Sequence, residues 1–494
     1  MSTAPPTPSR PPAARLLPRM PDWASRNFTL LTSAAFITSL GSHGALIAAA
    51  FAVLEHGGDA GDVGLVAAAR TIPLILFLLV GGAVADRLPR HRVMVAANLL
   101  NCLSQAAFAV LVLAGSPLLW QMMLLAALGG TGQAFFSPAA EGMLMATVDR
   151  RNASKAFAVF RVTMNGATIG GAALGGAMVA VIGPGWVLAV DAAAFAVSAG
   201  LRALLDLSGM PRRAPGGDLL ADLRDGWREA LARPWFWSIV AQFSVVVAVV
   251  GAAESVYGPL VARDHLGGPA PWGFALAAFG VGTVVGAVVM MRWQPRRLLL
   301  AGTLSVFTLA LPSAALAVPL PALGLAGVMF VSGLAIEVFG VAWITTMHQE
   351  IPEEKFSRMS AYDWLGSIGM VPLATALAGP AESAFGRSNA LWGGAVLIVL
   401  VTAAVLFVPE VRTMTRRPPE AEAAEDAGTP ETAEDAGTPE ESGPAAEPGP
   451  VPAVDTVTGA GAGAVVTAAT SVPAPAPEPG SDAADAEGAA RRDG

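Results

Sequence analysis

The sequence GGAVADRLPRHR, residues Gly81 to Arg92, separates two long apolar runs with a cluster of charge. One aspartate, three arginines and a histidine fall within the seven positions from Asp86 to Arg92. Each of these charges costs several kcal/mol in hydrocarbon, so the cluster is predicted to lie in water. Pro89 disfavours a helix that runs straight through it. The segment therefore predicts a water-side turn between two membrane-spanning helices.

Two interpretations fit this turn. A basic loop alone orients a membrane protein by the positive-inside rule, and that accounts for the arginines. It does not account for an aspartate four residues after Gly82. The same positions resemble the loop signature of the major facilitator superfamily, G-x-x-x-D-R-x-G-R-R/K, although Pro89 stands where that family usually has Gly. The matching residues are Gly82, Asp86, Arg87, Arg90 and Arg92.

The composition indicates a polytopic membrane protein. Hydrophobic residues make up 54% of the 494 positions and charged residues only 14%, whereas soluble domains carry about 25% charge. The net charge of −8 arises largely from an acidic C-terminal region. Cys102 is the single cysteine, which excludes an intramolecular disulfide. Arginine far outnumbers lysine, and alanine, glycine and proline abound, as expected of a GC-rich bacterial genome.

Twelve apolar segments approach the ~20 residues that a helix needs to cross a bilayer. The predicted spans are 28–54, 62–85, 93–114, 118–140, 155–182, 186–205, 235–262, 271–291, 298–318, 321–347, 359–381 and 388–408. Basic residues concentrate in the even-numbered loops, so the positive-inside rule places both termini in the cytoplasm of a plasma-membrane protein.

The spans fall into two sets of six. We expect an N-terminal tail over 1–27, a six-helix bundle over 28–205, an amphipathic linker at the cytoplasmic interface over 206–234, and a second bundle over 235–409. Residues 410–494 are rich in Pro, Ala and Glu and are predicted to be disordered. Matching loops recur in the two halves, including DRRNASK, which ends at Lys155, and PEEKFSR around Lys355. The predicted fold class is an all-α membrane protein with two pseudo-symmetric bundles and a solute site between them.

Several polar residues interrupt the predicted spans, and ionisable residues inside a membrane are functional candidates by default. Glu254 and Glu337 are the preferred proton carriers. Arg70, Arg161, Asn165 and His43 complete the set of proton or substrate candidates. Arg161 is expected to pair with a carboxylate rather than to touch substrate, and His43 to make an ordinary polar contact. Asp191 is interpreted as a helix cap near the outer end of its span.

The fifth span contains NGATIGGAALGG, which is similar to the glycine-rich antiporter signature of superfamily exporters ending in G-P-x-x-G-G. Gly171, Gly175 and Gly176 match, while Ala172 replaces the proline. These glycines are predicted to let the helix bend. Close packing of small residues, without any antiporter role, is the alternative.

Residues 24–410 most resemble the branch of the superfamily that contains enterobactin exporters and macrolide-efflux proteins. The resemblance rests on SRNFTLLTSAAFITSLGSHG, DLRDGWREALARPWFW and HQEIPEEKFSRMSAYDWLGSIG. It implies alternating access coupled to proton entry, with export of drug-like or siderophore-like molecules. It also assigns a cytoplasmic gate to Gly82, Asp86, Arg87 and Arg90, in which Asp86 would sit against the N-terminal end of the eleventh span, near Ser357.

Other functions are open or excluded by motif. An importer of the same fold is open, because only the incomplete glycine signature bears on direction. A membrane receptor is a weaker alternative. The sequence lacks H-E-x-x-H, aspartate clusters and phosphate-binding glycine loops, so we predict no enzyme activity, no metal and no cofactor, with the proton gradient as energy source. Expected partners are the bilayer, a small-molecule substrate and protons, with no nucleic acid, and the protein is expected to be a monomer.

Overall fold

The computed structural model describes residues 24–115, 117–148, 152–205, 228–293, 295–318 and 320–416, and the described regular structure is helical. The first six predicted spans are helices, each within a few residues of its predicted bounds. They are α1 (Arg26–Glu55), α2 (Ala60–Arg87), α3 (Arg90–Leu113), α4 (Leu119–Ala146), α5 (Ala153–Ile182) and α6 (Pro184–Ala203). Most of the predicted N-terminal tail, linker and C-terminal tail lies outside the described residues, in 1–23, 206–227 and 417–494.

The second set of spans is more broken. The seventh comprises α8 (Pro234–Ala252), the π-helical turn η2 (Ala253–Tyr257), α9 (Gly258–Val261) and a second π-helical turn, η3 (Ala262–Leu266). The remaining helices are α10 (Pro269–Arg292), α11 (Leu298–Val306), the 3-10 turn η4 (Phe307–Leu309), α12 (Ala310–Ala317), α13 (Ala322–Glu350), α14 (Glu353–Ile368), α15 (Val371–Phe385), α16 (Arg387–Val405) and α17 (Pro409–Thr413). The eleventh span begins at Glu353, six residues earlier than predicted, and is interrupted at Gly369 and Met370.

Within the described residues, eleven helical segments are long and apolar enough to cross a membrane. The helix α4 occupies the position of the remaining predicted span. Gln121, Gln133 and neighbouring glycines lower the hydropathy of its described part. Its 28 residues still extend about 42 Å at the usual rise per residue. It packs against α2 and α3, which places it in the first bundle together with α1, α2, α3, α5 and α6.

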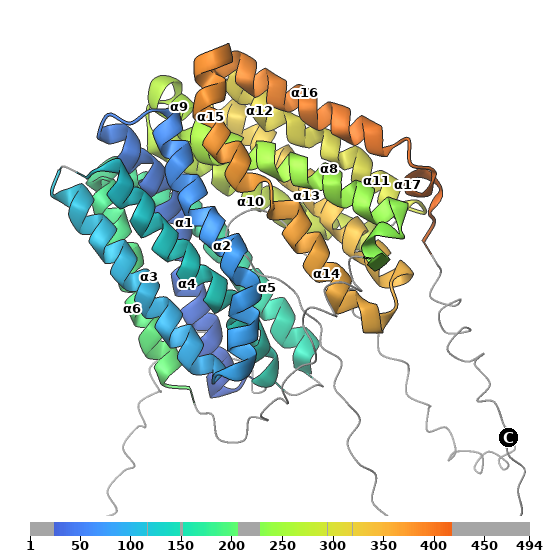
Figure 1. The fold of residues 1–494 in the computed structure, drawn as a ribbon, viewed down its shortest axis with the longest axis horizontal. Helices are drawn as coiled ribbons and strands as arrows, with labels where there is room; N and C mark the ends of the chain where they lie inside the picture. Colours follow the sequence, from blue (N-terminus) through green and yellow to red (C-terminus); the bar gives the residue numbers. More distant parts are fainter. Residues whose placement is uncertain are drawn as a thin grey trace, which may run out of the picture.

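The helices form two bundles with matching internal contacts. In the first bundle α2 packs on α4, α3 on α6 and α1 on both α5 and α6. In the second bundle α10 packs on α13, α12 on α16 and α8 on α14, α15 and α16. These pairs correspond helix by helix if the two sets of six spans are superimposed. Figure 1 shows the bundles meeting at one end and diverging toward the other.

The break in the ninth span has a local cause. Pro312 has no N–H to donate to the carbonyl of Thr308, and a free carbonyl is costly inside a membrane. The hydroxyl of Ser332 on α13 donates to the Thr308 carbonyl oxygen at 3.2 Å. The 3-10 turn η4 is therefore tolerated because a neighbouring helix supplies the missing hydrogen bond.

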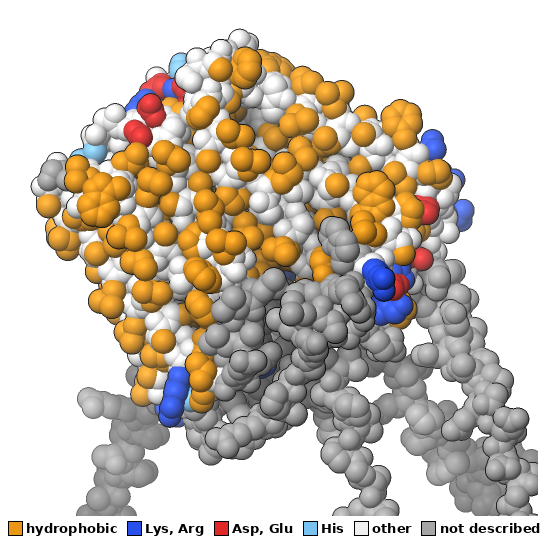
Figure 2. Space-filling model, in the orientation of Figure 1, with side chains coloured by type: hydrophobic (Ala, Val, Ile, Leu, Met, Phe, Trp, Pro, Cys, Tyr) orange, Lys and Arg blue, Asp and Glu red, His pale blue; other side chains and the backbone are white. Residues whose placement is uncertain are grey.

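The predicted turn within Gly81–Arg92 forms. The helix α2 ends at Arg87 and α3 begins at Arg90, with Pro89 as its N-cap residue. Apolar side chains cover most of the described face in Figure 2, while charged side chains lie at its margins, at the upper left, at the lower edge and on the right. That distribution suits a protein whose flanks face lipid and whose ends face water.

Candidate functional site at the contact between the two bundles

The two bundles touch through glycines at one end. On one side of the contact α2 packs against α15. Gly64 lies against the backbone carbonyl of Thr375, and Gly61 lies against Gly379. A Cβ atom on Gly64 or Gly379 would overlap the backbone of the opposite helix. Small residues of this kind allow membrane helices to approach with their backbones nearly in contact.

The second side of the contact joins α5 and α10. A Cβ atom on Gly273 would lie 2.5 Å from the Ala172 carbonyl oxygen and 2.8 Å from the Gly176 Cα atom. Both contacts lie near the α1–α2, α5–α6 and α15–α16 turns, which are the predicted outer turns. The protein is thus closed at that end, and Figure 1 shows the bundles spreading apart toward the other.

The three candidate glycines of α5 make close helix contacts. Gly176 faces Gly273 across the two bundles, as described above. Gly171 and Gly175 face α1 within the first bundle, where a Cβ on Gly171 would lie 2.5 Å from the Leu40 carbonyl oxygen and Gly175 abuts Gly44. The helix itself runs unbroken from Ala153 to Ile182. Close packing accounts for these contacts, and the predicted bending role remains a prediction.

Glu337 on α13 is buried beside Gly286 of α10 in the second bundle. Its side chain is 3% exposed, and within the described residues its Oε2 atom has no hydrogen-bond partner. Its charge interacts with that of Arg161 on α5, so the pair spans the two bundles. Arg161 also lies 6.0 Å from the Phe157 ring centroid, and Asn165 follows one turn later. Gly286 on α10 provides the space beside the Glu337 Cβ atom.

Glu254 lies in the π-helical turn η2 of the seventh span. Its Oε1 atom is buried and has no hydrogen-bond partner among the described residues. A π-turn places one extra residue in a helical turn, and such turns occur frequently at functional sites. An ionised carboxylate without partners is costly in a membrane, and the proton-carrier role of Glu254 remains a prediction.

A polar cluster inside the first bundle surrounds Asp191. This carboxylate is fully buried on α6 and accepts hydrogen bonds from Gln105 Nε2 at 2.6 Å and Ser42 Oγ at 3.2 Å. The positive charge of Arg70 interacts with the Asp191 carboxylate, and it also interacts electrostatically with the His43 imidazole. The Nδ1 atom of His43 lies 2.7 Å from the Ser39 carbonyl oxygen, an ordinary polar contact within α1.

The capping role predicted for Asp191 is wrong. The helix α6 is preceded by Gly183 and begins at Pro184, seven residues before Asp191. Asp191 instead joins α1, α3 and α6 in the interior of the bundle. The sequence shows an acid in an apolar run, but the partners lie on other helices and cannot be assigned from spacing alone.

Asp363 is a partly buried acid that sequence reasoning did not select. It lies on α14 and accepts a hydrogen bond from Trp343 Nε1 at 3.0 Å, within an aromatic cluster that includes Phe243 and Phe339. The available signal was an aspartate four residues into the predicted span 359–381. Its closeness to the span's end made it resemble an interfacial residue.

The gate motif is described only in its backbone. Gly82, Asp86 and Arg87 form the last turns of α2, and their side chains lie outside the described residues, while Arg90 opens α3. The contact between Asp86 and the start of the eleventh span is therefore still a prediction. Across the bundles, the described part of α2 packs on α15.

The chain belongs to the major facilitator superfamily. The profile described as "Major Facilitator Superfamily" matches residues 31–371. Multi-pass membrane proteins of this family are transporters, so the protein is a secondary transporter rather than an enzyme. This confirms the family and fold predicted from the Gly81–Arg92 turn and the paired spans.

Related proteins named as efflux systems cover most of the chain. The multidrug efflux pump Tap of Mycolicibacterium fortuitum is 29% identical over 403 residues, covering 78% of this chain and 96% of that protein. The enterobactin exporter EntS of Escherichia coli O127:H6 is 26% identical over 425 residues, covering 79% and 93%. These similarities confirm the predicted resemblance to bacterial exporters.

Solved structures support the fold alone. A bacterial homologue of the human lysosomal transporter Spinster, in an inward-facing and unoccupied conformation, aligns with a TM-score of 0.64 at 18% identity, covering 81% of this chain and all of that one. The nucleoside transporter NupG aligns with a TM-score of 0.63 at 12% identity, covering 79% of this chain.

Proposed function

We propose that the protein exports small hydrophobic or amphipathic molecules across the cytoplasmic membrane by alternating access, driven by inward proton movement. The observation that carries this proposal is the buried Glu337 carboxyl, whose charge interacts with that of Arg161 on the opposite bundle. A carboxylate at a moving interface meets a different environment in each conformation. It can therefore bind a proton in one conformation and release it in the other.

Arg161 gives this exchange a direction. With the outer end closed, Arg161 and Glu337 interact across the bundles, and the cation favours an ionised carboxylate. Separation of the bundles at that depth would remove the cation and favour protonation. Glu254, whose Oε1 atom also lacks a partner among the described residues, is the second proposed carrier. Asn165 and Arg70 are proposed to contribute polar contacts for the solute or the proton.

The cytoplasmic gate belongs to the opposite conformation. We expect Asp86 to approach the N-terminal end of α14, where aligned peptide dipoles place a partial positive charge, once the bundles close at the cytoplasmic end. The outer glycine contacts and this cytoplasmic latch would then stabilise alternate states. A few kcal/mol at either end is enough to reverse such an equilibrium. Both termini are proposed to be cytoplasmic, and the transporter to act as a monomer.

Transport by purified protein in liposomes tests the proposal, with ethidium as the probe and an imposed pH gradient. Glu337→Gln should abolish proton-driven accumulation while leaving ethidium exchange at equal pH. Glu55→Gln makes the same chemical change at an exposed position at the end of α1 and should transport normally. Undiminished proton-driven transport by Glu337→Gln would exclude Glu337 as the carrier. Accumulation in the opposite direction would identify an importer.

A further inference from the structure

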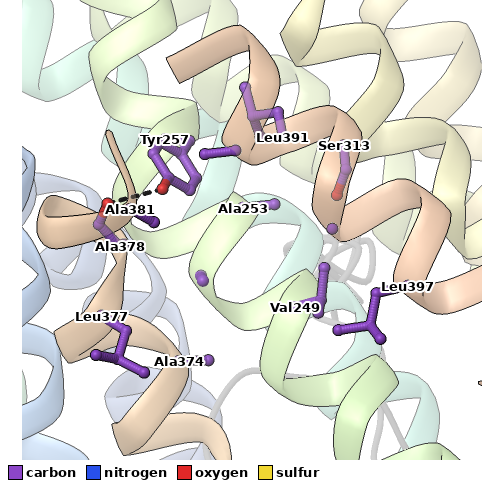
Figure 3. A pocket seen from close by; sticks show the side chains of 13 residues that line it. Val249, Ala253, Tyr257, Ser313, Ala374, Leu377, Ala378, Ala381, Leu391 and Leu397 are labelled. Carbon is purple, nitrogen blue, oxygen red and sulfur yellow. Dashed lines mark hydrogen bonds between the residues drawn. The ribbon is translucent and has the colours of Figure 1, made fainter. Parts of the chain in front are cut away.

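A groove lies on the flank of the second bundle, away from the contact between the bundles. Its volume is about 270 Å³, and it is bounded by α8 and η2, by α12, and by the helices α15 and α16 (Figure 3). Alanine, leucine and valine side chains supply most of its lining. Val249, Ala374 and Leu397 mark three of its sides.

The groove opens toward lipid. On its rim Leu377 is 51% exposed and Leu397 is 42% exposed, and both belong to the apolar outer surface of the bundle. The opposite face of α15 carries Thr375 and Gly379, which are occupied by the contact with α2. The groove also lies close to the α15–α16 turn, in the half of the membrane next to the closed end. It is therefore continuous with the lipid-facing surface in the outer leaflet.

An apolar space of this size needs an apolar occupant. An enclosed apolar cavity of ~150 Å³ stays dry and binds benzene, so a larger one bordered by lipid will take up hydrocarbon rather than water. The lining of the groove contains one polar side chain whose hydrogen-bonding capacity is unused. Ser313 on the groove wall is 1% exposed, and its Oγ atom has no hydrogen-bond partner among the described residues. The other hydroxyl of the lining, that of Tyr257, already donates to the Ala378 carbonyl oxygen at 2.8 Å.

We propose that this groove is a binding site for one acyl chain of an outer-leaflet phospholipid, with the Ser313 hydroxyl donating to the ester carbonyl at the head of that chain. The site differs from the solute pathway between the bundles. The chain fills the space between α15 and α16 and packs against the η2 turn that carries Glu254. The occupant is membrane lipid because the groove opens to the bilayer and its lining offers no charge for a cationic or anionic solute.

Photolabelling in liposomes tests this site. The wild-type protein is reconstituted with a phosphatidylglycerol that carries a diazirine in one acyl chain, and labelled residues are identified by peptide mass spectrometry. Label is expected to concentrate on Leu377 and Leu397 over Leu373 and Leu400, which are exposed on the same helices but outside the groove.

Two substitutions sharpen the result. Ala381→Phe fills the groove and should lower the labelling several-fold, whereas Ala384→Phe, one turn away on the same helix and outside the lining, should not. Ser313→Ala removes no hydrogen bond within the described protein and should lower the labelling about threefold, the effect of one hydrogen bond in a membrane protein. Labelling spread evenly over the four leucines, or insensitive to both Ala381→Phe and Ser313→Ala, would overturn the site. Loss of label on addition of ethidium would identify the occupant as a transported solute and overturn the lipid assignment.

Discussion

Gly273→Ala should shift the transporter away from the conformation that is closed at the outer end. The new Cβ atom would lie 2.5 Å from the Ala172 carbonyl oxygen and 2.8 Å from the Gly176 Cα atom. Both are backbone atoms of α5, so no side-chain rotation relieves the overlap. Overpacking of this kind costs about 1–3 kcal/mol. The cost applies only while α5 and α10 are in contact, so the outward-open population should rise about 5- to 150-fold relative to the closed one.

The outward-open population is measured by the reactivity of an introduced cysteine that is buried where α2 packs against α15, the second contact between the bundles. In a Cys102→Ser background, Thr375→Cys places a thiol where α15 meets α2, at a residue that is 1% exposed. A membrane-impermeant maleimide added outside should modify it faster in the Gly273→Ala variant, in proportion to the outward-open population. Gly327→Ala is the matched control, because it adds the same methyl group in a helix of the same bundle with nothing within 4 Å. Equal modification rates for Gly273→Ala and Gly327→Ala would refute the reasoning.

Three further predictions concern Asp191, Asp86 and Glu229. Asp191→Ala leaves Arg70, Gln105 and Ser42 without their shared carboxylate and should lower the free energy of unfolding by about 3–5 kcal/mol. Thermal unfolding should show a much lower melting temperature than that of the control Glu55→Ala. Equal melting temperatures for the two variants would contradict the buried cluster. Asp86→Asn should favour the inward-facing state and impair transport without preventing insertion, and unchanged labelling of interface cysteines would remove the latch. Glu229 should hold Lys355 at 3.1 Å only while ionised. Hydrogen bonds from Arg233 and Lys355 lower the pKa of Glu229. The protection factors of amides near residue 230, which correct for intrinsic exchange, should therefore stay constant above the usual glutamate pKa of about 4.3 and decrease as pH falls from that value through the lowered one. A loss of protection that begins near neutral pH would contradict the pair.

The sequence predicts the helices well because their cause is local. Twelve apolar segments and the charged turn before Arg92 follow from transfer energies that each segment meets on its own. The broken spans are less visible, although Pro312 and Pro372 are in the sequence, because the hydrogen bond that rescues the Thr308 carbonyl comes from Ser332 on another helix.

The candidate site is predicted only in part. Glu254 and Glu337 stand out as acids in apolar runs, and the structure buries an atom of each without a partner among the described residues. The interaction of Glu337 with Arg161 joins residues far apart in the chain. The same holds for the partners of Asp191 and Asp363 and for the pairing of Gly176 with Gly273. Such relations depend on how two bundles dock, and helical periodicity carries no information about docking.

In alternating access the two bundles rock about a site between them, opening one end as the other closes. Pulsed electron resonance distances measure this directly, with spin labels placed in a Cys102→Ser background. One pair joins Gly57 to Ser383 at the closed end, and the other joins Leu88 to Trp293 at the opposite end, all at exposed positions. A change in pH with ethidium present should lengthen the first distance while shortening the second. Distances that stay fixed, or that change in the same direction at both ends, would contradict alternating access in this protein.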